Sequence, residues 1–156
     1  MTIRWSKRND KQDILALEAV LYPEDALSSL RQFKWVTIKI KHIVVAYVVY
    51  LPYVAQPSII SFGVCSDNYD KDLKHLLYVL QEHVHLKAVL HNNPASLNVY
   101  LSDKSRFIKL FYDVGFNKCD DDVFILQDKT HAIEMTFLPD RNLSILETIY
   151  CCFKGH

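Results

Sequence analysis

The longest amphipathic pattern in the chain lies between residues 58 and 87. An apolar, β-branched run from Ile59 to Val64 predicts a strand, and the segment from Cys65 to Asp70 is polar. Apolar residues then recur at three- and four-residue steps, which predicts a helix of about five turns: Leu73, Leu76, Leu77, Leu80 and Val84. A helix that begins after a strand points unpaired N–H groups at the strand's end, where they can bind an anion. A plain strand-to-helix connection without a ligand fits the same pattern.

Upstream of this unit the pattern predicts a short strand and two helices. The strand is expected from Ile3 to Ser6, and Asn9 or Asp10 would cap the first helix. The residues that this helix turns inward would be Ile14, Leu17, Val20 and Leu21. It should end at Tyr22, because the residue before a proline disfavours the helical region. A second, shorter helix is expected from about Glu24 to Phe33.

Two β-rich runs then predict a hairpin. They extend from Val36 to Ile40 and from Ile43 to Leu51, with Lys41-His42 as the turn. The first run alternates as a half-buried strand does, with Thr37 and Lys39 on the polar face. The second run is almost continuously apolar, which predicts a central strand buried on both faces.

Downstream, the pattern predicts a strand from Ser96 to Leu101 and a short helix from Ser105 to Val114, closed by Gly115. A turn is expected from Asn117 to Asp122. The remaining predicted elements are a strand over 123–126, a bend at 128–129, a last strand over 132–138 and a C-terminal helix over 142–153. The apolar side of that helix would pack on the same domain or on a second copy of the chain, which would make a homodimer.

Composition narrows the class of protein. At 156 residues the chain fits one domain, and its 18 basic residues balance 18 acidic ones, so it carries no electrostatic signature of nucleic-acid or anionic-membrane binding. No apolar run approaches a membrane span, and the N-terminus lacks a signal peptide's apolar centre, so we expect a cytoplasmic protein. The four cysteines show no disulfide framework, and the seven histidines show no metal-ligand spacing, so we expect no metal.

The order of elements resembles the GNAT superfamily of acyl-CoA-dependent N-acetyltransferases. A strand ending in Val64, a polar turn and a long helix are followed by a second strand, a short helix and Gly115-Phe116 with an aromatic residue four positions earlier. The likeness covers roughly residues 3 to 138 and is one of layout more than of signature residues. It implies a mixed α+β fold, with a twisted, mostly antiparallel sheet of six or seven strands and about four flanking helices. Residues 1–138 would form this domain, and residues 139–156 a helical extension packed on it.

The resemblance also implies acetyl-CoA as the acyl donor and a primary amine, on a small molecule or a peptide, as the acceptor. The cofactor would contact the strand end at Phe62, Gly63 and Val64, and Phe111 on the short helix. It would also contact the corner residues Tyr69, Asp70, Lys71, Asp72, Leu73 and Lys74. The acceptor wall would include Tyr22, Glu24 and Asp25, and the candidate catalytic residues are Glu18 and Tyr112.

The chain departs from the family pattern at several of these positions. The family's cofactor loop has Arg or Gln, then Gly, then Gly or Ala, where this chain has Tyr69, Asp72 and Lys74. Asp72 would place a negative charge near the cofactor's diphosphate. A tyrosine that commonly protonates the leaving thiolate is Phe111 here, which has no proton to give.

Two further family positions differ. Lys104 stands where the family has asparagine, and Asn98 stands where one branch has a glutamate base. The sequence therefore leaves three functions open. One is a divergent N-acetyltransferase that works by direct attack of the amine on acetyl-CoA. The alternative is a GNAT-fold protein that has lost this chemistry and serves as a binding or interaction module. The third is an unrelated mixed α/β domain that serves only as an interaction module.

Overall fold

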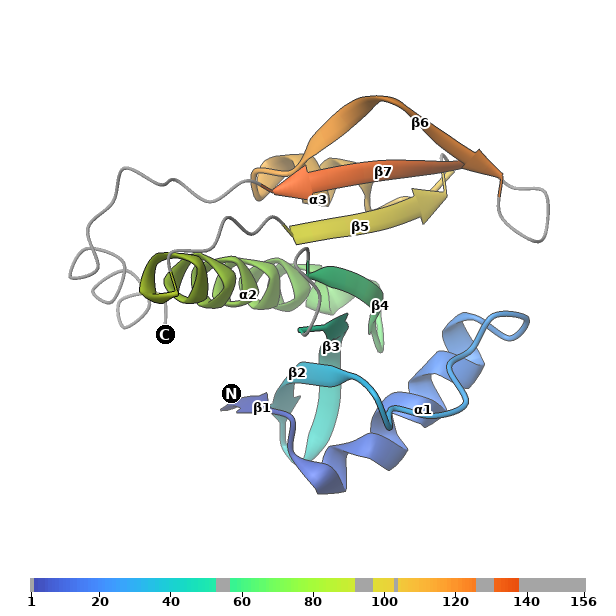
Figure 1. The fold of residues 1–156 in the computed structure, drawn as a ribbon. Helices are drawn as coiled ribbons and strands as arrows, with labels where there is room; N and C mark the ends of the chain where they lie inside the picture. The colour runs from blue at the N-terminus through green and yellow to red at the C-terminus, as the bar shows by residue number, and fades with distance from the viewer. Residues whose placement is uncertain (1, 53–56, 92–96, 103, 126–130, 138–156) are drawn as a thin grey trace. The chain divides into compact units, whose positions relative to one another are not determined.

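The structure is a computed structural model, and it describes residues 2–52, 57–91, 97–102, 104–125 and 131–137 (Figure 1). The predicted bend at 128–129 and the predicted C-terminal helix at 142–153 lie outside these residues. The chain divides into two compact units. Unit 1 comprises Met1–Pro52 and Ile59–Leu77, and unit 2 comprises Tyr53–Ser58 and Tyr78–His156.

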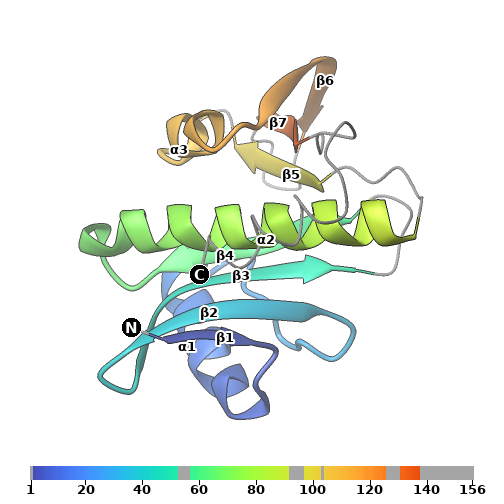
Figure 2. The ribbon, with the colours of Figure 1, turned by 90° about the vertical axis from the view of Figure 1, so that its left-hand side faces the viewer.

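The strands of unit 1 follow one another in chain order. They are β1 (Thr2–Trp5), β2 (Lys34–Ile40), β3 (Ile43–Leu51) and β4 (Ser58–Val64), and hydrogen bonds join them in the order β1-β2-β3-β4 (Figure 2). The pairs β1–β2 and β2–β3 are antiparallel. Residues Val44 to Tyr50 of β3 are all buried, which confirms the predicted central strand.

One helix packs against these strands. A 3-10 turn (Arg8–Asp10) leads into α1 (Lys11–Leu21), and the backbone N–H of Tyr22 closes its end on the carbonyl of Glu18 at 2.8 Å. The buried cluster between α1 and the strands consists of Ile14, Leu30, Trp35, Val44, Tyr47 and Val49. The helix and its predicted end are confirmed.

Three details of this region differ from the sequence predictions. Asp10 does not cap α1 through its side chain, which instead pairs with basic residues of β1 and β2. Val20 and Leu21 were expected to point inward, but they are 76% and 36% exposed. Thr37 was expected on a polar face, but it is buried because its hydroxyl donates to Asp10 Oδ2 at 3.3 Å.

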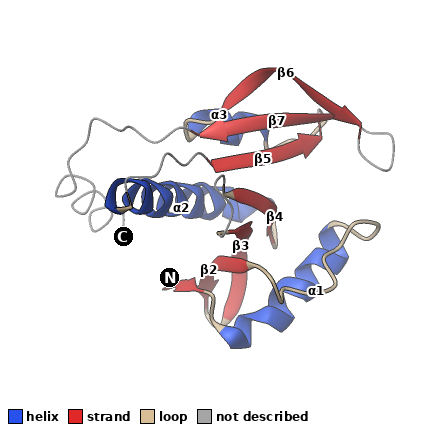
Figure 3. Ribbon diagram, in the orientation of Figure 1, coloured by secondary structure: helices blue, strands red, loops and turns tan. Residues whose placement is uncertain are grey.

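The second predicted helix, from Glu24 to Phe33, is wrong. This segment forms turns and irregular backbone (Figure 3). The carboxylate of Glu18 accepts the backbone N–H of Leu27 at 3.1 Å, so a side chain of α1 takes a donor that a helix would use otherwise. Ser28 and Ser29 also disfavour a helix here, because serine side chains compete for backbone hydrogen bonds.

The β2–β3 turn at Lys41 and His42 is confirmed. Both residues have positive φ, 50° and 68°, which is the backbone of the type I′ turn that suits a two-residue hairpin. Asn and Gly are the residues that favour this backbone, so a Lys-His pair occupies it at a cost.

The long helix is also confirmed. A 3-10 turn (Asp67–Tyr69) follows β4, and α2 then runs over 21 residues (Asp70–Leu90). The five apolar residues predicted to face the core are all buried. The first two turns of α2 belong to unit 1 and its remainder to unit 2.

Unit 2 contains β5 (Leu97–Ser102), α3 (Ile108–Asp113), β6 (Asn117–Ile125) and β7 (His131–Phe137), with strand order β5-β7-β6. Both pairs are antiparallel. The turn predicted over 117–122 is wrong, because β6 already begins there, with a shift of register between Lys118 and Val123. Helix α3 is shorter than predicted, since turns occupy the residues before Ile108.

Gly115 ends α3 as predicted. It has φ of 100°, its N–H donates to the Tyr112 carbonyl, and the N–H of Phe116 donates to the Phe111 carbonyl, both at 3.0 Å. These two bonds and the contact of the Phe111 and Phe116 rings, 5.0 Å between centroids, form a Schellman motif.

These elements confirm the predicted mixed α+β class with mainly antiparallel strand pairs. The described residues form seven strands and three α-helices. Among these helices, none combines the length and the apolar character that a membrane span requires.

Candidate functional site

The corner between β4 and α2 exposes backbone donors. Residues 65 to 68 are exposed. The N–H groups of Tyr69 and Asp70 donate to the carbonyls of Ser66 and Asp67 and so close the 3-10 turn. Within the described residues, the N–H groups of Ser66 and Asn68 have no partner. The corner therefore offers two unpaired N–H groups just before a helix N-terminus, which is an arrangement that suits an anion.

One side chain of the corner, the carboxylate of Asp72, disfavours the binding of an anion there. Asp72 is 6% exposed, and its Oδ2 is buried without a hydrogen-bond partner in the described part of the chain. Leu73 is buried in the core, Lys71 is exposed and Lys74 is half-buried. The backbone of the corner offers hydrogen-bond donors to an anion, whereas the carboxylate of Asp72 would repel one.

A buried carboxylate lies beside the end of β4. Glu18 of α1 is 1% exposed, and three donors surround it. Tyr47 Oη donates to Oε2, Ser61 Oγ donates to Oε2 at 2.6 Å, and the backbone N–H of Leu27 donates to Oε1 at 3.1 Å. All three donors are neutral, and no cation pairs with Glu18 among the described residues. Its negative charge is thus held by hydrogen bonds alone.

The surroundings of Tyr47 determine whether its hydroxyl is protonated. Burial first, and then the hydrogen bond to Glu18, raise the pKa of Tyr47 above its ordinary value. Tyr47 therefore remains a protonated donor at neutral pH. Ser61 is only half-buried, so its hydroxyl is the member of the network that a ligand could contact.

Gly63 brings β4 close to this network. A Cβ at this position would lie 2.5 Å from Leu21 Cδ1 and 2.9 Å from both Cε1 and Oη of Tyr47. Real Cβ atoms do not approach other atoms so closely. Only glycine therefore lets the β4 backbone pass beside the Tyr47 hydroxyl.

The three residues predicted to line the acceptor site have different surroundings in the structure. Tyr22 Oη donates to the Phe62 carbonyl at 2.5 Å, which places the end of α1 against β4. Among the described residues, Glu24 and Asp25 are exposed and make no hydrogen bond or ion pair with Glu18, Tyr47 or Ser61. Tyr22 thus lies next to β4, while Glu24 and Asp25 are exposed, and the acceptor role of all three stays a prediction.

The remaining predicted residues belong to unit 2. Phe111 is fully buried against Phe116 and presents no polar group. Tyr112 is 46% exposed, so its hydroxyl is accessible to solvent. Asn98 is buried and Lys104 is exposed.

Sequence reasoning missed Tyr47 and Ser61. Ser61 carried a usable signal, because it is a polar residue inside an apolar strand run. Tyr47 carried none, since a tyrosine in a central strand usually serves the core. Their hydrogen bonds with Glu18 join residues that are 29 and 43 positions apart in the sequence.

The structure resembles solved acetyltransferases. The aminoglycoside 6′-N-acetyltransferase of Enterococcus faecium aligns with a TM-score of 0.67 at 12% identity, over 90% of this chain and 100% of that enzyme. The ribosomal-protein-alanine N-acetyltransferase of Brucella melitensis aligns with a TM-score of 0.65 at 18% identity, over 88% and 99% of the two chains. A GNAT family acetyltransferase of Elizabethkingia anophelis, solved with acetyl-CoA bound, aligns with a TM-score of 0.59 at 17% identity, over 88% and 97%.

These likenesses establish the fold. The chain has the fold of the GNAT acetyltransferases along nearly all its length, as its order of elements predicted. No protein-family model and no curated protein sequence matches it.

Proposed function

We propose that the chain is an acetyl-CoA-dependent N-acetyltransferase that acts on a primary amine of a small molecule or a peptide. The observation that carries this proposal is the fold, which the chain shares with acetyltransferases over about nine-tenths of its length. One of those proteins was solved with acetyl-CoA bound. The network of Glu18, Tyr47 and Ser61 adds a group suited to the proton transfer that amine acetylation requires.

The corner between β4 and α2 would hold the diphosphate of acetyl-CoA. The unpaired N–H groups of Ser66 and Asn68 supply donors, and Lys71 and Lys74 supply positive charge. Asp72 opposes binding, so we expect a moderate affinity. Acetyl-CoA supplies the activated acetyl group, whose carbonyl carbon the amine attacks, with loss of the C–S bond and release of the CoA thiol.

Glu18 would take up the proton that the amine loses. A primary ammonium must lose one proton before it attacks and a second one as the amide forms, and the second passes to solvent. We assign the first to Ser61 Oγ, which passes its own proton to Glu18 Oε2 at 2.6 Å. Tyr47 and the Leu27 N–H keep the carboxylate oriented toward Ser61.

Tyr112 would protonate the departing thiolate in place of the aromatic residue at 111. Its phenol is solvent-accessible, whereas Phe111 is buried and has no proton to donate. The exposed carboxylates of Glu24 and Asp25, next to Tyr22 in sequence, would favour the approach of a cationic acceptor.

The experiment is acetyl transfer to a panel of primary amines and N-terminal peptides, followed by mass spectrometry of the acetylated product. With an acceptor in hand, Glu18→Gln should lower kcat by about 10²-fold or more while the KM for acetyl-CoA changes little. Ser61→Ala should lower kcat in the same direction, because it interrupts the same proton path.

Asp13→Asn is the matched control, since Asp13 is an exposed carboxylate of the same helix. It should leave kcat unchanged. A Glu18→Gln protein that stays folded and keeps full kcat would remove Glu18 from the mechanism. Acetyl-CoA binding without transfer to any amine in the panel would instead favour the binding-module function.

A further inference from the structure

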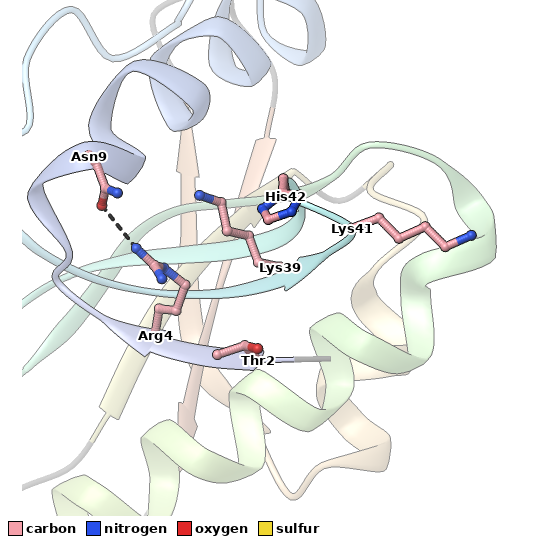
Figure 4. A pocket seen from close by; sticks show the side chains of 6 residues that line it. All are labelled: Thr2, Arg4, Asn9, Lys39, Lys41 and His42. Atoms are coloured by element: carbon pink, nitrogen blue, oxygen red, sulfur yellow. Dashed lines mark hydrogen bonds between the residues drawn. The ribbon is translucent and has the colours of Figure 1, made fainter.

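A basic pocket lies at the opposite end of the unit 1 strand order from β4. It has a volume of about 480 Å³ and is lined by Thr2, Arg4, Asn9, Lys39, Lys41 and His42 (Figure 4). Thr2 and Lys39 are direct cross-strand partners of β1 and β2, and Lys41-His42 is the β2–β3 turn. The strands β2 and β3 separate β1 from β4. The pocket therefore uses none of the residues assigned to acetyl transfer.

A buried carboxylate pairs with two of the basic residues that line this pocket. Asp10 is fully buried, and its Oδ2 accepts Arg4 Nε at 2.7 Å while its Oδ1 pairs with Lys39 Nζ at 3.0 Å. Burial by itself raises the pKa of Asp10, but the hydrogen bonds from Arg4 and Lys39 outweigh burial, and the pKa lies below its ordinary value. Asp10 is therefore ionised and holds both cations in place.

The cations keep unused donors. In the described part of the chain, Arg4 uses Nε with Asp10 and Nη2 with Asn9 Oδ1 at 2.9 Å, and its other N–H groups have no partner. The Lys39 ammonium makes one ion pair and retains further N–H donors. Arg4 and Lys39 pair with one carboxylate, which leaves one positive charge unbalanced, and Lys41 adds a second positive charge to the residues that line the pocket. The chain as a whole carries no net charge, so this excess is local.

The turn adds an independent observation. Lys41 and His42 both adopt positive φ, where Asn-Gly would fit without strain. Figure 4 shows Lys41 extending away from Arg4 and Asn9. Residues in sparsely populated backbone regions cluster at active sites and ligand clamps, where the surrounding structure holds them in place. In this turn, the side chains in question are two basic groups at the rim of a basic pocket.

We propose that this pocket is an anion site that binds a phosphate group, either as free phosphate or as the terminal phosphate of a small molecule. Arg4 and Lys39 would bind its oxygens from the strands and His42 from the turn, while Lys41 would add positive charge at the rim (Figure 4). A tetrahedral dianion matches the excess of two positive charges that Arg4, Lys39 and Lys41 leave over Asp10. The volume leaves room for an organic group attached to the phosphate.

The test is an NMR titration of the ¹⁵N-labelled full chain at constant ionic strength, with inorganic phosphate, ribose 5-phosphate and neutral ribose in separate arms. The amide signals of Arg4, Lys39, Lys41 and His42 should shift saturably with both phosphates and not with ribose. Tighter binding of ribose 5-phosphate identifies an organic phosphate as the ligand, and equal affinities identify free phosphate.

The double variant Lys41→Asn/His42→Gly separates binding from folding. It removes two basic side chains but gives the turn its preferred residues, so the thermal midpoint should stay or rise while the phosphate Kd weakens at least about fivefold. Lys109→Asn, an exposed lysine of α3, is the charge-matched control and should leave the Kd unchanged. His42→Asn is a second variant, because asparagine tolerates the positive φ of this position. It should also raise the phosphate Kd.

No saturable shift with either phosphate, equal shifts with ribose, or an unchanged Kd in both turn variants would overturn the proposal. Glu18→Gln should leave the phosphate titration unaffected. The experiments can thus disprove the anion site without disproving the acetyl-transfer function, and the reverse.

Discussion

Two buried carboxylates of unit 1 have opposite surroundings. Asp10 is paired with Arg4 and Lys39, so its charge is balanced by cations. Glu18 receives only neutral donors from the described residues, two hydroxyls and one backbone N–H. A carboxylate locked between cations is a poor proton acceptor, whereas one held by hydroxyl groups can exchange protons through them. This contrast is why Glu18 and not Asp10 is assigned the proton-accepting role.

Asp72 gives a prediction about cofactor affinity. Its carboxylate is buried near the start of α2 with one oxygen unpaired, so it repels an anion at the corner. Asp72→Asn removes the charge at nearly constant volume. Because a like-charge pair costs about 1 kcal/mol in a water-like medium, the Kd for CoA in isothermal titration calorimetry should tighten about fivefold. Asp13→Asn should leave this Kd unchanged, and weaker binding by Asp72→Asn would contradict the assignment of the corner.

His83 gives a prediction about pH and stability. Burial, and then the charge of Lys87, lower the pKa of His83 from 6.5 to about 4. Between these values the unfolded chain binds a proton that the folded chain does not, so the free energy of unfolding falls as the pH drops from 6.5 to 4. His83→Gln should remove about 1–2 kcal/mol of that fall.

Urea denaturation at a series of pH values measures this difference. His91→Gln, at an exposed histidine, is the control. If the unfolding free energy of His83→Gln declines with acid as steeply as that of the wild type, His83 is not the residue responsible.

At the scale of elements, β4 depends on a glycine at one position. Gly63→Ala would force a Cβ into Leu21 and the Tyr47 ring, at 2.5 Å and 2.9 Å. We expect a loss of about 1–3 kcal/mol in unfolding free energy, which is typical of overpacking. Leu21 is a flexible side chain that is 36% exposed, so Leu21→Ala should cost little by itself.

The double variant Gly63→Ala/Leu21→Ala is the matched test, with chemical denaturation as the measurement. It should recover part of the loss but not all of it, because the contact with Tyr47 remains. Full recovery would show that Tyr47 does not confine β4.

The sequence predicts these elements best where hydrophobic period and capping agree. Helix α2 combines a regular apolar face with an abrupt polar start, and the β2–β3 hairpin combines two apolar runs with a short turn, so both were predicted closely. The predicted helix from Glu24 to Phe33 failed because Glu18, a residue outside the segment, takes the N–H of Leu27. The turn predicted from Asn117 failed because β6 tolerates polar residues and a register shift. The local sequence pattern gives no indication of such tertiary contacts.

At the scale of the whole molecule, the fold was predictable and the site only in part. The order of elements indicated the GNAT fold, which the solved acetyltransferases share. The resemblance suggested Glu18 as a candidate catalytic residue, which stays a prediction, and its hydrogen-bond partners Tyr47 and Ser61 meet it only in three dimensions. The basic pocket is likewise assembled from β1, the 3-10 turn and the β2–β3 turn, so no local motif marks it.

The central claim is that the chain binds acetyl-CoA as its acyl donor. Thermal unfolding of the wild-type chain over a range of acetyl-CoA concentrations tests this most directly. The account predicts a saturable rise in stability that reaches roughly 2.7 kcal/mol at 100 times the Kd. No change at millimolar acetyl-CoA, in the wild type and in Asp72→Asn alike, would contradict it.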